Sequence, residues 1–494
     1  MHMSNLQQRQ EKIQAKRKQT SFRDFLREIA SRRPLLFYKT QWWVSRYPAS
    51  DRTGEIIPFK QFEKQDTITG DYKGNFFRDF QSMRLHALTP AVRQVWLCEN
   101  ADYADMIHTG KNIYLSVISI YGCENILYSF ATREQTTNVI NSMMVFDNAA
   151  NIYQSTGVIS SYAIFYSRFI SNSHDLWFCG NCIGCYECVW CDGLVNQSYC
   201  IDNTSYTKEE YQSRKKDFLK AKSQFEDKYS RISLQGSCIG SSKTTWSFVV
   251  NSESVENGYF SYNTKDARNI CFVGWAHGNT HMYDVFVWWA VMGNHIYGTQ
   301  WAGNSEHIYC SAICNDCSYL YYCIGCLGCS FCFWCTWLSN KSYCILNKQY
   351  TKEERYAKVD EIFTQMEKDW QLWEFFPATM NPFYFNDTAA YLIDPSFTKE
   401  EVTAQWFLRR DEPIKVDIPE WAVIVRNNDL GQFELYDEKW NRNLDDTVCK
   451  RVIIDESGDA YRIIPMELDF LQKHGLPLPR KHWLTRMKEN FRIS

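Results

Sequence analysis

The sequence has no hydrophobic run long enough to span a membrane and none of the motifs that mark the common enzyme classes. Its longest apolar run of note, VFVWWAVM at 285–292, is far shorter than the roughly 20 residues that a membrane helix needs. A glycine loop that cradles phosphate, an HExxH helix and a nucleophile elbow are all missing. We therefore expect no contact with a membrane, and no residue stands out as catalytic.

Neither sign of charge dominates, since 54 Lys and Arg face 57 Asp and Glu. The positive charge is nevertheless concentrated at 7–34 and 473–494, which leaves the middle of the chain acidic. The polar first residues lack the apolar core of a signal peptide. We therefore expect a cytoplasmic, reducing location for the twenty cysteines, where disulfides are rare.

Cysteine is abundant, and it is arranged in two copies of one cluster. The segment CGNCIGCYECVWCDGLVNQSYC at 179–200 recurs as CIGCLGCSFCFWCTWLSNKSYC at 323–344, with all six cysteines displaced by 144 residues. Both copies run on into Y-T-K-E-E, at 206–210 and 350–354, where the threonine can cap a helix. The chain is therefore a tandem duplication of a cysteine cluster followed by a helix.

A shorter period precedes each cluster. Six-residue blocks such as KNIYLS at 111–116 recur every 12 or 13 residues, and such a fixed step is typical of a solenoid. In the first copy the third and sixth positions form the columns Ile113, Ile126, Val139, Ile152, Ile164, Leu176 and Ser116, Ser129, Ser142, Ser155, Ser167, Cys179. In the second copy the columns read Gly258, Ile270, Met282, Ile296, Ile308, Leu320 and Ser261, Val273, Val285, Thr299, Ser311, Cys323. We expect both columns of the first copy to be buried.

A coil of 12 or 13 extended residues has a perimeter of about 40 Å, which suits short strands around a thin core. We predict a mainly β fold, a tandem-duplicated, short-rung parallel β-solenoid with capping helices and a C-terminal α+β domain. The expected domains are a basic N-terminal helix (1–34), an N-terminal cap for the first coil (35–92), a first solenoid with its cysteine cluster and helix (93–229), a second such solenoid (230–373) and the C-terminal domain (374–494).

A resemblance supports this architecture over nearly the full length. The CIGC-type clusters followed by NKSYCILNKQYTKEE, the segment NPFYFNDTAA at 381–390 and the ending YRIIPMELDFLQKHGLPLPRKH at 461–482 carry it. They resemble a family of large cysteine-rich proteins abundant in Candidate Phyla Radiation bacteria and found in some large phages. The family is known mainly as uncharacterised or zinc-ribbon proteins, so the resemblance implies a fold, possible zinc knuckles and a phage-associated alternative for the location. Only Cys449 lies near 455–464, so the knuckle at this end is degenerate.

The cysteine clusters allow two interpretations. Their C-x2-C steps are metal-type spacing, and thiolates bind zinc or iron–sulfur clusters. Yet Cys179 and Cys323 continue the small-residue column, where cysteine can pack as a small hydrophobe. We favour packed free thiols and no cofactor, with disulfides a further alternative. Zinc or an iron–sulfur cluster stays open, held by Cys179, Cys182, Cys185 and Cys188 and by Cys323, Cys326, Cys329 and Cys332.

The second position of each block forms a further column. It reads Asn112, Asn125, Asn138, Asn151 in the first copy and Asn257, Asn269, His281, His295, His307 in the second. Stacked imidazoles about 5 Å apart could hold a metal. We favour histidine as a turn residue in place of asparagine, because no carboxylate partner is evident at the same column.

Three functions remain open. The first is a non-catalytic structural or scaffolding protein that uses the solenoid for contact with itself or a protein partner, in a phage or another large complex; Tyr114, Tyr153, Trp288 and Trp289 are expected to face outward for such contacts. The second is a nucleic-acid-binding protein that uses its basic ends. The candidate contacts at the C-terminal end are Arg480, Lys481, Arg486, Lys488 and Arg492. The third is the metal protein described above. We favour the scaffold, because the acidic middle disfavours phosphate.

Overall fold

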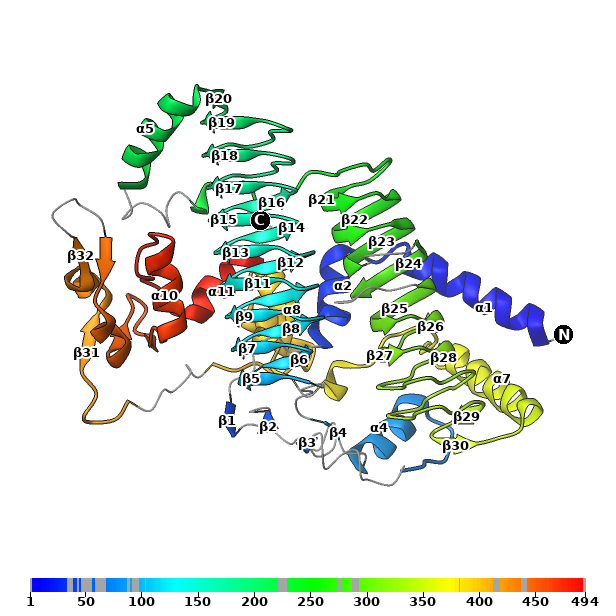
Figure 1. Ribbon diagram of the computed structural model, residues 1–494. Helices are drawn as coiled ribbons and strands as arrows, with labels where there is room; N and C mark the ends of the chain where they lie inside the picture. Colours follow the sequence, from blue (N-terminus) through cyan, green and yellow to red (C-terminus); the bar gives the residue numbers. More distant parts are fainter. Residues whose placement is uncertain are drawn as a thin grey trace. The chain divides into compact units, whose positions relative to one another are not determined.

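The computed structural model describes residues 2–32, 39–41, 44–45, 56–57, 68–86, 89–90, 97–102, 104–220, 229–273, 278–286, 293–381, 383–411, 418–436 and 442–491. The chain divides into two compact units. Unit 1 comprises Met1–Arg93 and Ser237–Arg410, and unit 2 comprises Gln94–Gly236 and Asp411–Arg492. Each unit contains one copy of the duplicated solenoid and one end of the chain, so the predicted parallel β-solenoid in two copies is confirmed (Figure 1).

The first solenoid (97–205) lies in unit 2 and consists of two parallel sheets. One sheet contains β5 (Glu99–Asp102), β7 (Lys111–Tyr114), β9 (Glu124–Leu127), β11 (Thr137–Ile140), β13 (Ala150–Tyr153), β15 (Tyr162–Phe165), β17 (His174–Trp177), β18 (Tyr186–Val189), β19 (Ser198–Ile201) and the antiparallel β20 (Thr204–Ser205). The other contains β6 (Asp105–His108), β8 (Val117–Ile120), β10 (Phe130–Arg133), β12 (Met143–Phe146), β14 (Thr156–Ile159) and β16 (Arg168–Ser171). Successive turns therefore pair rung on rung.

Every third residue along the turns has a left-handed backbone conformation. Asn112, Leu115, Ile118 and Tyr121 have φ of 54°, 48°, 59° and 62°, and each such residue turns a corner. The residue that follows a corner points into the core, as Ile113 does. A turn thus has four sides of three residues, and a 13-residue turn places two left-handed residues in succession at one corner.

This geometry confirms both predicted columns of the first copy. The branched side chains Ile113, Ile126, Val139, Ile152, Ile164 and Leu176 are all 0% exposed. The serines of the second column are equally buried, and the hydroxyl of each accepts a backbone amide of the next turn. The Oγ of Ser155 donates to the carbonyl of Tyr153 (2.8 Å) and accepts the amide of Ser167 (3.1 Å). At this position the serine hydroxyl therefore takes the place of a backbone hydrogen-bond partner, which the tight corner does not provide.

The second solenoid (238–349) lies in unit 1 and has longer strands. Its sheet contains β21 (Trp246–Val250), β22 (Glu253–Tyr262), β23 (Thr264–Val273), β24 (Asn279–Phe286), β25 (Asn294–Gly303), β26 (Glu306–Tyr309), β27 (Ala312–Asn315) and β28 (Ser318–Tyr321), and the solenoid ends in the antiparallel pair β29 (Cys344–Ile345) and β30 (Lys348–Gln349). The cysteine-rich turns between 323 and 344 continue it as single bridged residues.

The columns predicted for the second copy are partly wrong. Met282, Ile296, Ile308 and Leu320 do share one buried column, but Ile270 lies level with Val285 and not with Met282. Val285, Thr299, Ser311 and Cys323 therefore continue the column of Gly258 and Ile270. The reason is one long turn, since Arg268 pairs with Tyr283, 15 residues further on. Three extra residues shift every inward position by one side of the turn.

Each solenoid is closed at its C-terminal end by an asparagine. The Asn347 side chain accepts the amide of Thr336 (2.9 Å) and donates to its carbonyl (3.0 Å), as the backbone of a further rung would. Asn203 makes the same two bonds, both 2.9 Å, to Asp192. The helices predicted after each copy follow these caps, α5 (Lys208–Lys220) and α7 (Lys352–Lys368), and Thr351 forms the expected capping box with Glu354. The asparagine side chains thus occupy backbone amide and carbonyl groups at the sheet edge that would otherwise pair with another strand.

The N-terminal region of unit 1 packs along the second solenoid. It contains α1 (His2–Arg17), α2 (Phe22–Glu28), the 3₁₀ turn η1 (Ala30–Arg32), β1 (Lys39–Gln41), β2 (Val44–Ser45), β3 (Ile56–Ile57), α4 (Phe76–His86) and β4 (Thr89–Pro90). Phe25, Leu26 and Ile29 of its predicted apolar face are buried. The segment after α7 joins this layer through η3 (Ala378–Met380), η4 (Phe385–Asp387), α8 (Ala389–Ile393) and α9 (Lys399–Ala404), and Thr398 caps α9.

Arg17 fixes α1 to the second solenoid. It is fully buried, its Nη1 lies 3.4 Å from Asp284 and 3.2 Å from Glu28, and its Nη2 donates to the carbonyl of Trp373 (2.8 Å). Gly298 makes room for it, because a Cβ there would lie 3.0 Å from the Arg17 Nε and the backbone φ is +58°. Burial raises the pKa of Asp284 to about 6 even though the guanidinium lowers it.

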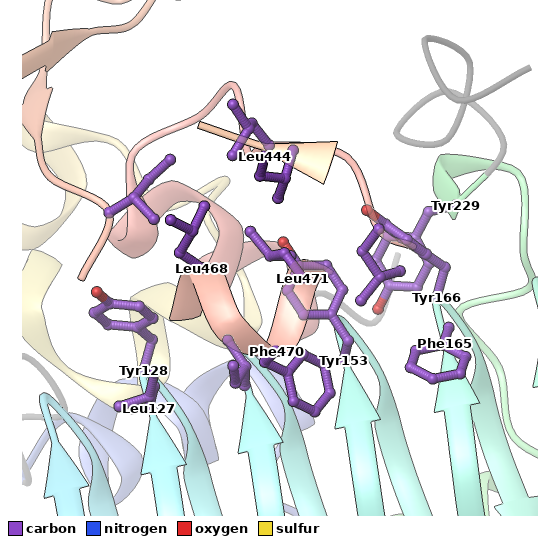
Figure 2. Close-up of a cluster of buried hydrophobic side chains, with 14 of the residues drawn as sticks. Leu127, Tyr128, Tyr153, Phe165, Tyr166, Tyr229, Leu444, Leu468, Phe470 and Leu471 are labelled. Carbon is purple, nitrogen blue, oxygen red and sulfur yellow. The ribbon is translucent and has the colours of Figure 1, made fainter. Parts of the chain in front are cut away.

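The C-terminal region of unit 2 covers the first solenoid, on the side equivalent to the one that the N-terminal region of unit 1 covers on the second solenoid. It contains β31 (Ile424–Arg426), η5 (Asn427–Phe433), β32 (Glu434–Tyr436), β33 (Arg442–Leu444), η6 (Asp446–Lys450), β34 (Val452–Ile454), β35 (Ala460–Tyr461), α10 (Pro465–Lys473) and α11 (Trp483–Phe491). Figure 2 shows Phe470 and Leu471 of α10 directed at Tyr153 on the strand edges. The outward position expected for Tyr153 is therefore wrong, Tyr114 is half covered, and Trp288 and Trp289 lie outside the described residues.

The compact units cut across the domain ranges expected from the sequence. Residues 374–410 belong to unit 1 and residues 411–492 to unit 2, so 374–494 is not one compact piece. The segment expected to cap the first coil, 35–92, contacts the second solenoid instead through its described residues. Gly70 donates to the carbonyl of Leu346 (2.9 Å), and Phe76 stacks on Trp334 at 3.8 Å, both in the last turns of the second solenoid.

Candidate functional site

The cysteine clusters form the inner lining of the last turns of each solenoid. Cys179, Cys182, Cys185 and Cys188 are 0–1% exposed and occupy four successive inward positions. The amide of Cys179 donates to the Oγ of Ser167 (3.0 Å), the bond that each serine of that column makes to the one before it. Because an inward position falls every third residue, C-x2-C spacing follows from the shape of the turn as well as from metal chemistry.

The second cluster repeats this arrangement in unit 1. The Sγ atoms of Cys323, Cys329 and Cys332 each lie 3.4 Å from the carbonyl oxygen two residues earlier, and that of Cys326 lies 3.9 Å from its equivalent. Sulfur that donates in this way packs as a small, weakly polar group. Among the described residues, no group of three or more His, Cys, Asp or Glu side chains is arranged to hold a metal ion.

Hydrogen bonds from neighbouring thiols lower the pKa of Cys182 and of Cys191 to about 4, whereas at several other thiols the largest effect is burial. It raises the pKa of Cys317 to about 12, and those of Cys123 and Cys310 to about 11. For Cys314 and Cys323, burial holds the pKa well above its usual value. A thiol becomes a nucleophile or a metal ligand only as the thiolate, so the thiols with a raised pKa are inert at neutral pH.

The most distinctive exposed feature is a column of six stacked rings on the second solenoid, here called the ring stripe. It consists of His281, His295, His307, Tyr319, Phe331 and Tyr343, one from each successive turn. Neighbouring ring centroids lie 4.4–5.2 Å apart and the planes are inclined by only 5–13°. All six residues are left-handed and half-buried, so ring edges face solvent while ring faces stack on one another.

The column expected to contain these histidines is wrong in its first two members. Asn269 lies level with Asp284, to which it donates (2.8 Å), and His281 lies level with Asp266. The cause is again the 15-residue turn. A carboxylate therefore does stand in the histidine column, with the Asp266 Oδ2 3.8 Å from the His281 Nε2, although the sequence spacing hid it.

The geometry of the stripe argues against chelation of one metal ion by its histidines. An imidazole binds a metal in the plane of its ring, and three nearly parallel rings with neighbouring centroids 4.7–4.8 Å apart do not direct their nitrogens at one point. Burial lowers the pKa of His295 and of His307, and the neighbouring imidazoles lower that of His295 further. Both shifts favour the neutral form of these two imidazoles.

The first solenoid builds the same column from amides. Asn100, Asn112, Asn125 and Asn138 each donate to the asparagine on the next rung at 2.9–3.1 Å, and the last acceptor is Asn151. The two copies thus stabilise one position by different means, hydrogen-bonded amides in one and stacked rings in the other. Beside the stripe, a second ladder of Tyr283, Tyr297, Tyr309 and Tyr321 is buried, partly under Lys18, Gln10 and Trp373. Of these two ring ladders of the second solenoid, the ring stripe is the half-exposed one among the described residues.

The basic N-terminal end is engaged within unit 1. Arg9 pairs with Asp360 at 2.6 Å, and Arg23 pairs with Asp394 at 2.6 Å and with Glu401 at 2.7 Å. Lys12, Lys16, Arg17, Arg27 and Arg32 also bond to carboxylates or carbonyls of the same unit. The positive charge of this end thus neutralises acids of 360–401, and it is largely withdrawn from contact with phosphate.

The C-terminal basic residues are divided in the same way. Arg486 is buried, with its Nη2 2.9 Å from Glu467 and its Nη1 3.2 Å from the hydroxyl of Tyr153, so it cannot reach a nucleic acid. Lys481 pairs with Glu489 at 2.7 Å and Lys488 is half-buried. Arg480 is exposed, and Arg492 lies outside the described residues. Of the predicted nucleic-acid contacts, Arg486 is therefore excluded by its burial, and Lys481 is engaged in an ion pair.

Comparison with known proteins adds no identity, since no family model, no curated protein and no solved structure matches the chain. Across the described residues, none of the helices has the length and apolar character needed to cross a membrane. The interpretation of the site therefore depends on its geometry alone.

Proposed function

We propose that this protein is a non-catalytic scaffold that acts through contacts of its solenoids with other protein surfaces. The observation that carries the proposal is the ring stripe, an ordered row of six aromatic side chains that stays half-exposed on a closed, regular framework. Exposed aromatic side chains that are gathered in one continuous row typically mark a contact site for a partner. The resemblance to proteins of large phages suggests assembly of a phage or another large complex, in the cytoplasm, as the setting.

Two further features support a scaffold over a reaction centre. The clustered thiols point into the core and are at most 2% exposed, so a substrate in solvent does not reach them. The asparagine caps and the hairpins behind them occupy the C-terminal edges of both solenoids, which disfavours growth by adding strands there. Contacts through a lateral face, such as the one that carries the ring stripe, are then the natural mode of assembly.

Nucleic-acid binding is the competing function, and the ion pairs at both ends disfavour it. We expect an apparent Kd weaker than about 1 µM at physiological salt, with an affinity that falls steeply with added salt and is independent of sequence. Binding of labelled DNA and RNA would be measured by fluorescence anisotropy at two salt concentrations. The variants are Lys12→Ala/Arg480→Ala, which removes two exposed cations at the basic ends, and the matched control Lys208→Ala/Lys216→Ala on α5.

Both variants should bind as the intact chain does, within about twofold, because neither pair belongs to a nucleic-acid site. Deleting 1–34 would be a poorer test, since it removes Arg17 from the packing of unit 1. Tight, sequence-selective binding at physiological salt that is lost in Lys12→Ala/Arg480→Ala and retained in the control would establish the nucleic-acid function instead.

A further inference from the structure

The two ends of the ring stripe carry different side chains, and this order limits which partner surfaces can pair with it. Read along the solenoid, three imidazoles are followed by Tyr319, Phe331 and Tyr343. The ring faces are occupied by one another, at 4.4–5.2 Å, so a sugar or a base could stack only on the two end rings. What the stripe offers along its length is a row of edges with nitrogen and hydroxyl groups, repeated once per rung.

We propose that the ring stripe is an interface between two copies of this chain, related by a two-fold axis that crosses the stripe between His307 and Tyr319. The inference rests on the proposed scaffold function and names its partner. In such an isologous contact the two stripes run antiparallel. Each chain's His307 then faces the other chain's Tyr319, His281 faces Tyr343, and His295 faces Phe331.

Complementarity of polar groups is the first argument for this partner. Under the two-fold axis, two of the three imidazoles on each chain meet a phenol, which can both donate and accept a hydrogen bond. A neutral imidazole has one nitrogen of each kind, so the pair is satisfied in either tautomer. The Nδ1 atoms of His281 and His295 are buried and have no hydrogen-bond partner within the described part of the chain, and the Nδ1 of His307 contacts the hydroxyl of Tyr309 (3.2 Å), so Nε2 is the nitrogen left to meet a phenol.

The repeat of the stripe is the second argument. Rings from successive rungs recur at the spacing of paired strands, about 4.8 Å, and only another surface with that repeat stays in register over six rungs. A second copy of this chain has the same repeat, because it carries the same stripe. Because the pKa values of His295 and His307 are lowered, two stripes can meet at neutral pH without repulsion between like charges.

The size of the contact sets the expected strength. Six rungs span about 24 Å from the first ring to the last. One such stripe with its neighbours makes an interface at the low end of those that are stable in solution, so we expect a reversible dimer with a micromolar Kd. Sedimentation equilibrium from about 1 to 100 µM should show a concentration-dependent dimer at pH 7.5.

The variant His281→Asn/His295→Asn/His307→Asn gives these positions the amide chemistry of the first solenoid, so folding should be retained. It should weaken the dimer at least tenfold. A wild-type chain that stays monomeric over the whole range, or a dimer that this variant leaves unchanged, would overturn the two-fold interface. Either result would leave the scaffold open to a different partner, whereas the nucleic-acid measurement above tests the scaffold itself.

Crosslinking tests the antiparallel arrangement directly. In a Cys98→Ser/Cys238→Ser background, which removes the exposed cysteines, His281→Cys/Tyr343→Cys places two thiols about 24 Å apart in one chain but opposite each other across the interface. Mild oxidation should give a covalent dimer on a non-reducing gel. The single variants and Asn112→Cys/Asp175→Cys, the pair with the same spacing in the first solenoid, should not. Equal crosslinking of the control pair, or none by the test pair, would contradict the arrangement.

Discussion

Replacing Arg17 by alanine is expected to lower the free energy of unfolding of unit 1 by about 3–5 kcal/mol. The guanidinium is fully buried and is paired with Asp284, which is itself 0% exposed. Its removal would leave the buried carboxylate of Asp284 with the amide of Asn269 but without its cationic partner, and the carbonyl of Trp373 without this donor. The contacts of α1 with the second solenoid should be lost first, because Arg17 ends that helix.

The measurement is denaturant unfolding followed by tryptophan fluorescence and near-ultraviolet circular dichroism. Lys16→Ala is the matched control from the same helix turn. Its partner Glu374 and Lys16 itself are 50% and 41% exposed, so the loss of that pair should cost less than about 1 kcal/mol. A similar small effect for Arg17→Ala would show that the N-terminal helix is not fixed to the solenoid in this way.

Ile152→Asn is expected to destabilise the first solenoid by about 4 kcal/mol or more. Ile152 lies level with Val139 on one rung and Ile164 on the next, and all three are completely buried. The amide would lose the packing of the isoleucine and would have no hydrogen-bond partner in an apolar column. Because a solenoid is stabilised between neighbouring turns, the damage should spread to the adjacent rungs.

Two milder variants serve as controls for Ile152→Asn. Ile152→Val removes one methylene group and should cost about 1 kcal/mol. Ser155→Cys should be tolerated as well, because Cys179 is fully buried in the same column and its Sγ donates to the carbonyl of Trp177 as the Oγ of Ser155 does to that of Tyr153. Hydrogen exchange of rung amides would locate the loss. If Ile152→Asn proved as stable as Ile152→Val, this column would not face the core.

Some of this structure was predictable because residue type and spacing act together. The isoleucine and serine columns of the first copy repeat at nearly equal steps, and packing then requires like residues to stack, as Ile113 and Ile126 do. The capping box at Thr351 was equally plain, since the hydrogen bonds are local. Contacts between residues far apart in the sequence were not predictable in this way. Nothing near Arg17 in the sequence indicates Asp284, which lies on a rung far along the chain.

The errors have physical causes. The second copy contains one 15-residue turn, so extrapolating a 12-residue step misplaced Ile270 and hid Asp266 beside His281. The three-residue sides were also missed. Left-handed residues are usually glycine or asparagine, whereas here Leu115 and Ile118 adopt that conformation because the rung hydrogen bonds impose it. The same three-residue step explains the C-x2-C spacing, which otherwise suggests a metal site.

The metal content of the purified protein tests most directly whether the cysteine clusters are part of the solenoid core. Elemental mass spectrometry should find zinc and iron well below one per chain, and a strong chelator should leave the melting temperature unchanged. Cys326→Ala/Cys329→Ala should still fold, at a cost of a few kcal/mol from the cavity. One or more zinc or iron atoms per chain, lost in this variant or with chelator together with the fold, would contradict the account and make the clusters a metal centre.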